Sequence, residues 1–306
     1  MEQLKVFAPA TVANLSCGFD VLGCCLDSVG DEMLIKKNDL KTVRITRISG
    51  QDLPLEADKN VAGVAVNALL SELNIDQGFD IEIDKKIKPG SGIGSSAASS
   101  AGAVFAVNKI MGEPFTKQEL ISFAMKGELL ASGNAHADNV APALLGGFSL
   151  VRSYCPLEVL SLPVPEELRV VILHPLIEIK TKDSRSIIKQ NISLKSAINQ
   201  WGNLGAFVSA LYTKDYDLIG RSLQDEIVEP IRSILIPYFN DLAALVAFNG
   251  ALGFGISGSG PSVYALCRGD KNATKVKNAI QNFYSDKMID FELHQSSINK
   301  SGVRIL

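Results

Sequence analysis

The order of hydrophobic and polar positions predicts a chain that mixes strands with helices. Residues 41–48 (KTVRITRI) and 80–87 (DIEIDKKI) alternate in polarity, which is typical of strands with one buried face. Between them, NVAGVAVNALLSEL has the spacing of an amphipathic helix, with Asp58 and Asn60 as candidate N-caps. We therefore expect a strand, helix, strand unit that leads directly into a glycine-rich segment.

A second helix is predicted over TKQELISFAMKGELLAS, where Thr116 and Glu119 have the spacing of a capping box and Gly133 marks the end. The segment that follows, NAHADNVAPALLGGFSLV, is interpreted as a polar turn and then a strand. These two segments contain Glu128, His136 and Asn139, three of the candidate site residues.

The chain has 306 residues, which exceeds the usual length of one domain and favours two domains that share a cleft. The proline-bearing stretch CPLEVLSLPVPEELR places the expected boundary near residue 165, which gives domains over 1–165 and 166–306. The second half begins with an apolar strand, RVVILHP, and continues through a long helical region from about 183 to 239. Because strands and helices do not alternate regularly in either half, the predicted fold class is α+β.

Composition narrows the possible partners and the compartment. The net charge is −3, and Lys and Arg are scattered along the chain without forming a basic stripe, so nucleic acid is not expected as a partner. We find no signal-peptide pattern and no apolar run long enough for a membrane span, which favours a cytoplasmic protein. The five cysteines show no C-x-x-C spacing, so we expect neither a disulfide framework nor a zinc site.

The glycine-rich segment KPGSGIGSSAASSAG (88–102) is the strongest candidate for binding chemistry. Gly90, Gly92 and Gly94 permit positive φ, and Ser95 and Ser96 stand where a helix would begin, so free N–H groups can converge on an anion. A triphosphate held there needs its charge offset, and the usual agent is Mg²⁺ with oxygen ligands. Ser96 and Glu128 are the candidate ligands, although a surface position for Glu128 is an alternative interpretation.

Three motifs together resemble those of the GHMP kinases. They are APATVANLSCGFDVLG (8–23), PGSGIGSSAA in the glycine loop, and the late loop GFGISGSGPSVYAL, and they occur in the family's order along the whole chain. Within the family, ANLSCGFDVLG, GELLASGNAHADNVAPALLGG, TKDSR and DEIVEPIRSILIP resemble the homoserine kinase branch. Tyr238 departs from the pattern, because many members carry glycine there.

The resemblance implies a two-domain α+β fold: an N-terminal domain like domain 2 of ribosomal protein S5 and a ferredoxin-like C-terminal domain, with the substrate site in the cleft. It also implies a homodimer that uses ATP and Mg²⁺ to phosphorylate the side-chain hydroxyl of L-homoserine, in threonine biosynthesis. The residues that it implies for ATP binding are Asn60, Lys88, Pro89, Gly90, Ser91, Gly92, Ile93, Gly94, Ser95, Ser96, Ala97, Ala98 and Ser99.

The resemblance also assigns the substrate contacts. Arg185 and Arg232 would bind the carboxylate of homoserine, and the carboxylate of Asp20 would accept hydrogen bonds from its ammonium group. Asn139 would orient the hydroxyl, and because an amide is no base near neutral pH, the proton would pass directly to phosphate. The remaining implied contacts are Asn14, His136, Thr181 and Gly258.

Two other interpretations stay open at this point. The protein could be another GHMP kinase that acts on a branched acid such as mevalonate or on shikimate, since two arginines suit any carboxylate. It could also be a relative that binds a ligand without catalysis, although the glycine loop and the metal carboxylate are intact.

Overall fold

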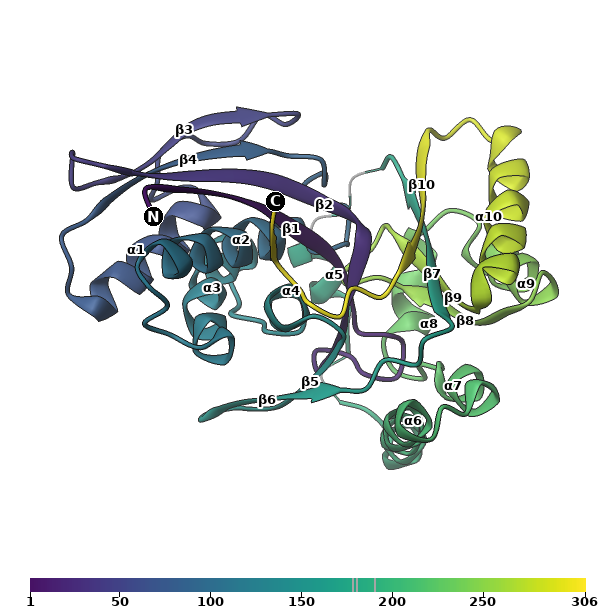
Figure 1. Ribbon diagram of the computed structural model, residues 1–306. Coiled ribbons are helices and arrows are strands. Elements are labelled where there is room, and N and C mark those ends of the chain that lie inside the picture. Colours follow the sequence, from purple (N-terminus) through teal and green to yellow (C-terminus); the bar gives the residue numbers. More distant parts are fainter. Residues whose placement is uncertain (178, 180, 190) are drawn as a thin grey trace.

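Two β-sheets with helices packed against them form the protein (Figure 1). The structure is a computed structural model that describes residues 1–177, 179, 181–189 and 191–306. The first sheet has the strand order β11-β1-β2-β4-β3, and β5 joins it by pairing with β2 and β6. Its strands are β1 (Gln3–Ala13), β2 (Leu22–Asn38), β3 (Val43–Ser49), β4 (Gly78–Asp84), β5 (Phe148–Tyr154), β6 (Leu157–Leu162) and β11 (Arg304–Ile305).

The predicted strand, helix, strand unit is confirmed. Strands β3 and β4 are parallel, and helix α1 (Val61–Leu73) connects them, whereas the other paired strands of this sheet are antiparallel. Asn60 caps α1, since its side chain accepts a hydrogen bond from the N–H of Ala62 at 3.0 Å. Lys85 and the glycine loop follow directly after β4.

Helices α1, α2 (Ser95–Ile110) and α3 (Lys117–Ser132) lie side by side on one face of the first sheet (Figure 1). The capping box of Thr116 and Glu119 is confirmed, and Gly133 ends α3 with a left-handed φ of 76°. Helix α2 is rich in small residues and therefore packs closely against β1 and β2: a Cβ on Gly102 would lie 2.8 Å from the Cβ of Ala8. This packing fixes the N-terminus of α2 relative to the sheet.

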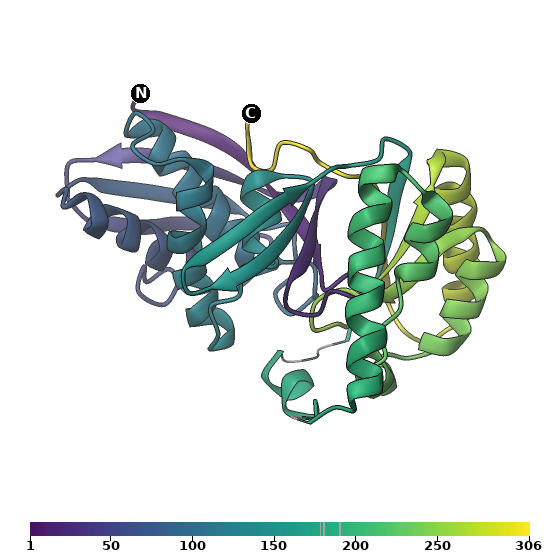
Figure 2. The ribbon, with the colours of Figure 1, turned by 90° about the horizontal axis from the view of Figure 1, so that it is seen from below.

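The second sheet is antiparallel, in the order β10-β7-β9-β8, with α9 and α10 near it (Figures 1 and 2). The long α6 runs beside the β5–β6 hairpin (Figure 2). Phe207 of α6 meets Phe148 of β5 edge to face, with ring centroids 5.9 Å apart. The elements of this half are β7 (Leu168–Pro175), α5 (Thr181–Ser186), α6 (Leu194–Thr213), α7 (Tyr216–Ser222), α8 (Glu229–Arg232), η1 (Ser233–Leu235), α9 (Phe239–Phe248), β8 (Ala251–Ile256), β9 (Val263–Arg268), α10 (Gly269–Ser285) and β10 (Phe291–Ser297).

The two halves share one continuous core in addition to a separate core under the second sheet. The larger core includes side chains from both sheets, such as Phe148 of β5 and Tyr264 of β9, together with Phe207 of α6. The C-terminal segment also returns to the first sheet, where Ile305 pairs with Val6. The two halves are thus held together by the shared core and by the return of the C-terminal segment to the first sheet.

Two sequence-based predictions of elements need correction. The helical region from 183 to 239 is divided into several helices, of which α6 is the longest, because Lys214 adopts a left-handed φ of 56° and Asp215 caps a new helix. The polar turn before β5 contains a short helix, α4 (Val140–Leu145), whose first turn accommodates Pro142. The proline-bearing stretch also contains a strand that was not predicted, β6, which pairs with β5 and ends before residue 165; the domain boundary near residue 165 stays a prediction.

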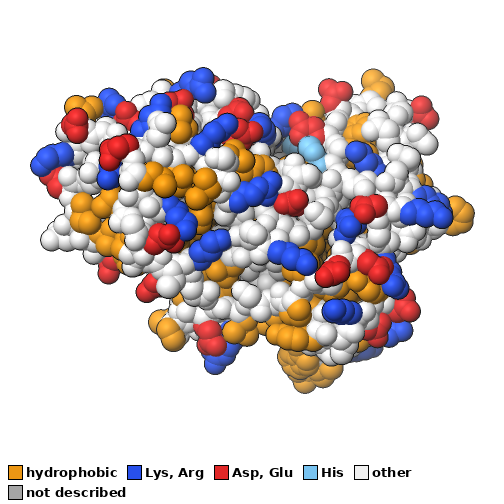
Figure 3. Space-filling view, viewed as in Figure 1, with side chains coloured by type: hydrophobic (Ala, Val, Ile, Leu, Met, Phe, Trp, Pro, Cys, Tyr) orange, Lys and Arg blue, Asp and Glu red, His pale blue; other side chains and the backbone are white. Residues whose placement is uncertain are grey.

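The charges on the face shown in Figure 3 do not indicate a particular class of partner. Acidic and basic side chains are interspersed on the face shown in Figure 3. In the described part of the chain no single helix has the length and apolar composition for crossing a membrane; only the bent pair 229–235 and 239–248, taken together, passes that test. The cytoplasmic location and the homodimer stay predictions.

Candidate active site

The glycine loop adopts the backbone conformation that its sequence predicts. Gly90, Gly92 and Gly94 have φ of 73°, 84° and 70°. A Cβ on Gly94 would lie 2.0 Å from the Oγ1 of Thr11, so steric contact as well as φ requires glycine there. Gly94 is also the N-cap of α2, so the loop ends at the point where the helix begins.

The first turn of α2 presents backbone N–H groups toward the loop. The first hydrogen bond of the helix runs from the N–H of Ala98 to the carbonyl of Gly94, so the N–H groups of Ser95, Ser96 and Ala97 precede the intrahelical ladder. These groups lie at the positive end of the helix dipole, and Ser95 and Ser96 line a pocket. The arrangement suits a phosphate.

The late glycine loop contacts the first one directly, and no open cleft separates them at this point. The Oγ of Ser257 donates to the carbonyl of Gly92 at 2.8 Å, and the N–H of Ser262 donates to the carbonyl of Ser91 at 3.2 Å. A Cβ on Gly92 would lie 2.7 Å from the carbonyl oxygens of Ser257 and Gly260. The second half of the chain therefore supports the loop from behind.

Glu128 lies beside Ser96, and both line the pocket. The carboxyl is buried, with 8% of the residue exposed, which excludes the surface position considered from sequence. Burial raises its pKa to about 7, while the hydrogen bond with Ser96 and the charge of Lys85 act in the opposite direction. Its Oε1 is buried and has no hydrogen-bond partner among the described residues, so a cation or a proton could occupy that position.

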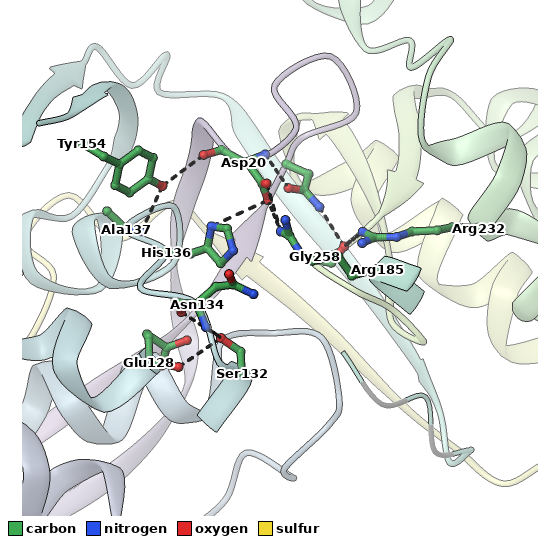
Figure 4. A network of polar contacts seen from close by, with 11 residues as sticks. Asp20, Glu128, Ser132, Asn134, His136, Ala137, Tyr154, Arg185, Arg232 and Gly258 are labelled. Carbon is green, nitrogen blue, oxygen red and sulfur yellow. Dashed lines mark hydrogen bonds and ion pairs between the residues drawn. The ribbon is translucent and has the colours of Figure 1, made fainter. Parts of the chain in front are cut away.

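A second group of charged side chains, Asp20, Arg185 and Arg232, lines the same pocket at a distance from Glu128 (Figure 4). The Nη2 of Arg185 donates to both carboxylate oxygens of Asp20, at 2.7 and 2.9 Å. The backbone of Asp20 is fixed by the side chain of Asn14, because the N–H of Asp20 donates to the Oδ1 of Asn14 at 3.0 Å. Asn14 and Asp20 both have positive φ, of 73° and 61°, which marks this turn as strained.

Arg232 lies deeper than Arg185, with 3% of the residue exposed. Its Nε donates to the carbonyl of Ser184 at 3.0 Å and its Nη1 to the carbonyl of Gly258 at 3.2 Å. Burial is the main reason that its pKa falls to about 10, and the neighbouring charge of Arg185 adds to the fall. The centroid of the Phe19 ring lies 5.2 Å from the guanidinium of Arg232 and 5.5 Å from that of Arg185, so one aromatic ring contacts both cations.

His136 and Asp138 complete this side of the pocket. The Nδ1 of His136 lies 3.9 Å from Asp20, and burial lowers the histidine pKa, which favours the neutral imidazole. Asp138 is almost fully buried, and burial together with the charges of Asp20 and Glu128 raises its pKa to about 7. Several carboxylates thus share a small volume, which a cationic ligand would relieve.

Asn139 is positioned by a residue from the first strand. The Oγ1 of Thr11 donates to the Oδ1 of Asn139 at 2.7 Å. This hydrogen bond fixes the orientation of the amide, so the Nδ2 group has a defined position as a donor, while Oδ1 keeps a second lone pair. The site therefore combines the anion-binding glycine loop, the carboxyl of Glu128 beside the hydroxyl of Ser96, and the amide of Asn139. The charged side chains around Asp20 complete it.

Comparison with known proteins identifies this combination. The model of the GHMP kinase N-terminal domain matches residues 60–147, and that of the GHMP kinase C-terminal domain matches residues 207–286. These matches cover more than half of the chain and include the glycine loop, Glu128 and Asn139. The chain belongs to the GHMP kinase family. The two-domain α+β fold expected from the sequence is thereby confirmed.

Individual GHMP kinases resemble the chain over its full length. A homoserine kinase of Chlorobium phaeobacteroides (strain BS1) is 41% identical over 100% of both chains, and one of Methanococcus vannielii is 38% identical over 93% of this chain and 94% of its own. The crystal structure of homoserine kinase from Cytophaga hutchinsonii has a TM-score of 0.96 and 49% identity, covering 100% of this chain and 98% of that one.

The pocket brings together most of the residues that the sequence of this GHMP kinase singles out. Those that line it are Asn14, Asp20, Pro89, Gly90, Gly92, Gly94, Ser95, Ser96, Glu128, His136, Asn139, Arg185, Arg232 and Gly258. Ala131, Ser132, Asp138 and Ser259 line it as well. The side chain of Thr181 lies outside the described part of the structure.

The other predicted nucleotide contacts lie around the pocket without lining it. Asn60 is buried as the cap of α1, and the Nζ of Lys88 pairs with Glu292 at 2.9 Å. The Oγ of Ser99 accepts a hydrogen bond from Lys85 at 2.9 Å. Ser91, Ile93, Ala97 and Ala98 are buried. Nucleotide binding by these residues stays a prediction.

Sequence reasoning missed some residues that build the site. Thr11 and Phe19 lie within the first GHMP motif, so the motif itself was the available signal for both. The hydroxyl of Tyr154 accepts from the N–H of Ala137 and donates to the carbonyl of Asp20, both at 3.2 Å, and thereby joins two pocket segments (Figure 4). Nothing in the local sequence around Tyr154 indicates this role.

Proposed function

We propose that this protein transfers the γ-phosphoryl group of ATP to the side-chain hydroxyl of L-homoserine, which yields ADP and O-phospho-L-homoserine, a step of threonine biosynthesis. The feature of the pocket that carries the proposal is the adjacent pair of Arg185 and Asp20, which lines the same pocket as the glycine loop. An α-amino acid carries a carboxylate next to an ammonium. The guanidinium of Arg185 would bind the carboxylate, and the neighbouring carboxylate of Asp20 would bind the ammonium. The full-length similarity to homoserine kinases supports the same substrate.

The glycine loop would bind the phosphates through backbone N–H groups. Because no Lys or Arg side chain lines that side of the described pocket, the phosphate charge needs another partner. Ser96 and Glu128 would hold Mg²⁺, whose preference for oxygen ligands fits a hydroxyl beside a carboxylate with a buried, unpartnered Oε1. When bound, the ion neutralises charge on the phosphates during transfer.

Asn139 would orient the substrate hydroxyl. Its Oδ1 accepts from Thr11, which orients the amide, and its Nδ2 would donate to the hydroxyl oxygen or to a phosphate oxygen. An amide cannot accept a proton at neutral pH, so the hydroxyl proton passes to the phosphate as the new P–O bond forms and the bond to ADP breaks. In this mechanism the protein contributes position and charge compensation in place of a general base.

Substrate choice would depend on Asp20. A carboxylic acid without an ammonium would compete for Arg185 and leave the carboxylate of Asp20 without a cationic partner, which is costly in a half-buried site. Homoserine provides the replacement partner for Asp20. Mevalonate and shikimate do not, so they should be poor substrates.

The test is release of ADP from MgATP with homoserine, mevalonate, shikimate, serine and galactose supplied separately at equal concentration. We expect strong turnover with homoserine alone. Strong turnover with mevalonate or shikimate would refute the ammonium site at Asp20. If none of the five supported turnover, the catalytic proposal itself would fail.

A further inference from the structure

A buried ion pair lies behind the glycine loop, outside the pocket. The Nζ of Lys85 donates to the Oδ2 of Asp31, and the two side chains are 1% and 0% exposed. Lys85 immediately follows β4, and Asp31 is part of β2. Neither residue lines the pocket, so neither is placed to touch a ligand there. Apart from the charge that Lys85 exerts on Glu128, any role of the pair in the reaction must be exerted through other residues.

Each member of the pair holds a different end of the glycine loop. The Oδ1 of Asp31 accepts the N–H groups of Lys86 and Ile87, at 2.8 and 2.9 Å, where the chain enters the loop. The Nζ of Lys85 donates to the carbonyl of Ser95 at 2.6 Å and to the Oγ of Ser99 at 2.9 Å, where the chain leaves it.

The entrance and the exit are also joined directly. The Oγ of Ser95 donates to the carbonyl of Ile87 at 2.9 Å. The loop between them, with its three glycines of positive φ, thus begins and ends on one network of polar contacts. Glycine-rich segments have many accessible conformations, so fixing both ends removes much of that freedom before a ligand arrives.

Stability alone is a weak explanation for such a pair. Transfer of two charges into the protein interior is costly, and replacement of a buried ion pair by neutral groups is often neutral or stabilising. The burial of Lys85 lowers its pKa, opposed by the charge of Asp31, which is the expected sign of that cost. What the pair offers in return is a defined geometry, since its hydrogen bonds have few alternatives in the core.

We infer that Lys85 and Asp31 are positioning residues that hold the glycine loop in the conformation that binds the phosphates of ATP. The inference rests on the proposed function in so far as the loop binds a nucleotide. It does not depend on which hydroxyl compound accepts the phosphoryl group.

The informative variant is the double substitution Lys85→Met with Asp31→Asn. Asparagine keeps an oxygen for the N–H groups of Lys86 and Ile87, and no charge is left unpaired in the core, so the double variant should fold. The control is Lys86→Met, the same change one residue along the chain, at a lysine whose side chain is 51% exposed and pairs with Glu32. Both proteins lose one lysine near the loop, but the double variant also loses the charge of Asp31 and so keeps the net charge of the parent, whereas Lys86→Met lowers it by one.

The measurement is the affinity for the magnesium complex of adenylyl imidodiphosphate by calorimetry, together with thermal unfolding and steady-state kinetics. We expect the double variant to bind the analogue about tenfold more weakly than the parent. Its KM for ATP should rise and its kcat should fall about 10- to 100-fold, while the KM for homoserine stays unchanged. A purely structural role would lower the melting temperature without this separation of the two KM values.

Parental affinity in a folded double variant would overturn the inference, and so would an equal loss in Lys86→Met. A double variant that cannot fold would also overturn it, because the pair would then serve stability. Since binding of the analogue requires no acceptor substrate, this result can be read even if homoserine is not phosphorylated.

Discussion

The two sides of the pocket are built in different ways. On the phosphate side, backbone N–H groups, positive-φ glycines and the start of α2 form the binding surface, and the side chains of Ser95 and Ser99 point back into the network that holds the loop. On the side of Asp20, charged side chains form the surface and neutralise one another. The first side is ready for its ligand, whereas the second must exchange an internal ion pair for contacts with the substrate.

The comparison predicts how substitutions should act. Changes on the phosphate side should affect phosphoryl transfer itself, because little can rearrange there. Changes on the substrate side should mainly affect the KM for homoserine, because the remaining charged side chains can form new ion pairs with one another. Glu128 faces the phosphate side, and it should show the largest effect.

Glu128→Gln should lower kcat about a thousandfold, since loss of a metal-binding carboxylate removes several kcal/mol of charge stabilisation. Steady-state kinetics at saturating MgATP and homoserine would measure the loss. Glu119→Gln is the matched control, because Glu119 lies on the same helix and glutamine can replace it in the capping box. A loss of less than tenfold in Glu128→Gln would remove Glu128 from the proposed mechanism.

The same substitution should stabilise the ligand-free protein at alkaline pH. The pKa of Glu128 is about 7 in the folded protein, above the ordinary value of 4.5, so the folded state binds this proton more tightly than the unfolded state does. The resulting stability is fully present below pH 4.5 and is lost as the pH rises through 7. Glu128→Gln should therefore exceed the parent in free energy of unfolding by on the order of 1–3 kcal/mol at pH 8.

That difference should shrink toward pH 5, where the parent carboxyl is mostly protonated when folded. Denaturant unfolding without nucleotide or metal would measure it at both pH values. Asp138 has a similar upward shift in pKa, caused first by its burial, which both proteins share. The smaller contribution from the charge of Glu128 is lost in Glu128→Gln and favours the variant in the same pH range. An advantage that stays constant between pH 5 and pH 8 would contradict the assignment to Glu128.

On the substrate side, Arg185→Met should raise the KM for homoserine about a hundredfold, because it removes the partner of a carboxylate and leaves Asp20 without its cation. The KM for ATP should stay within twofold of the parent value. Arg152→Met is the control, since Arg152 pairs with Glu158 on the exposed β5–β6 hairpin. Equal increases in both KM values would mean that the two sides of the pocket are not independent.

The same contrast explains what could be predicted from the sequence. The conformation of the glycine loop and the caps of α1 and α3 depend on neighbouring residues, and these predictions are confirmed. The pairing of Arg185 with Asp20 joins residues that are 165 positions apart, and no local pattern predicts it. Strands β1 and β2 were also not predicted, although they lie in the middle of the first sheet.

Thr11 lies between the two sides and should give the smallest of these effects. Its N–H donates to the carbonyl of Ile93 in the glycine loop at 3.1 Å, and its Oγ1 donates to Asn139 at 2.7 Å. The register between β1 and β2 shifts between Pro9 and Thr11, an irregularity of the kind that redirects a side chain near an active site. One residue thus relates the phosphate loop to the group that would orient the hydroxyl.

Thr11→Val keeps the shape and the backbone contact but removes the hydroxyl, so only the link to Asn139 is lost. We expect kcat to fall about tenfold with both KM values unchanged, because a misaligned hydroxyl still binds but reacts less often. Thr11→Ser retains the donor and should restore most of the rate. If the serine and valine variants were equally slow, packing around Thr11 would explain the loss, and the two sides of the pocket would be coupled through the core.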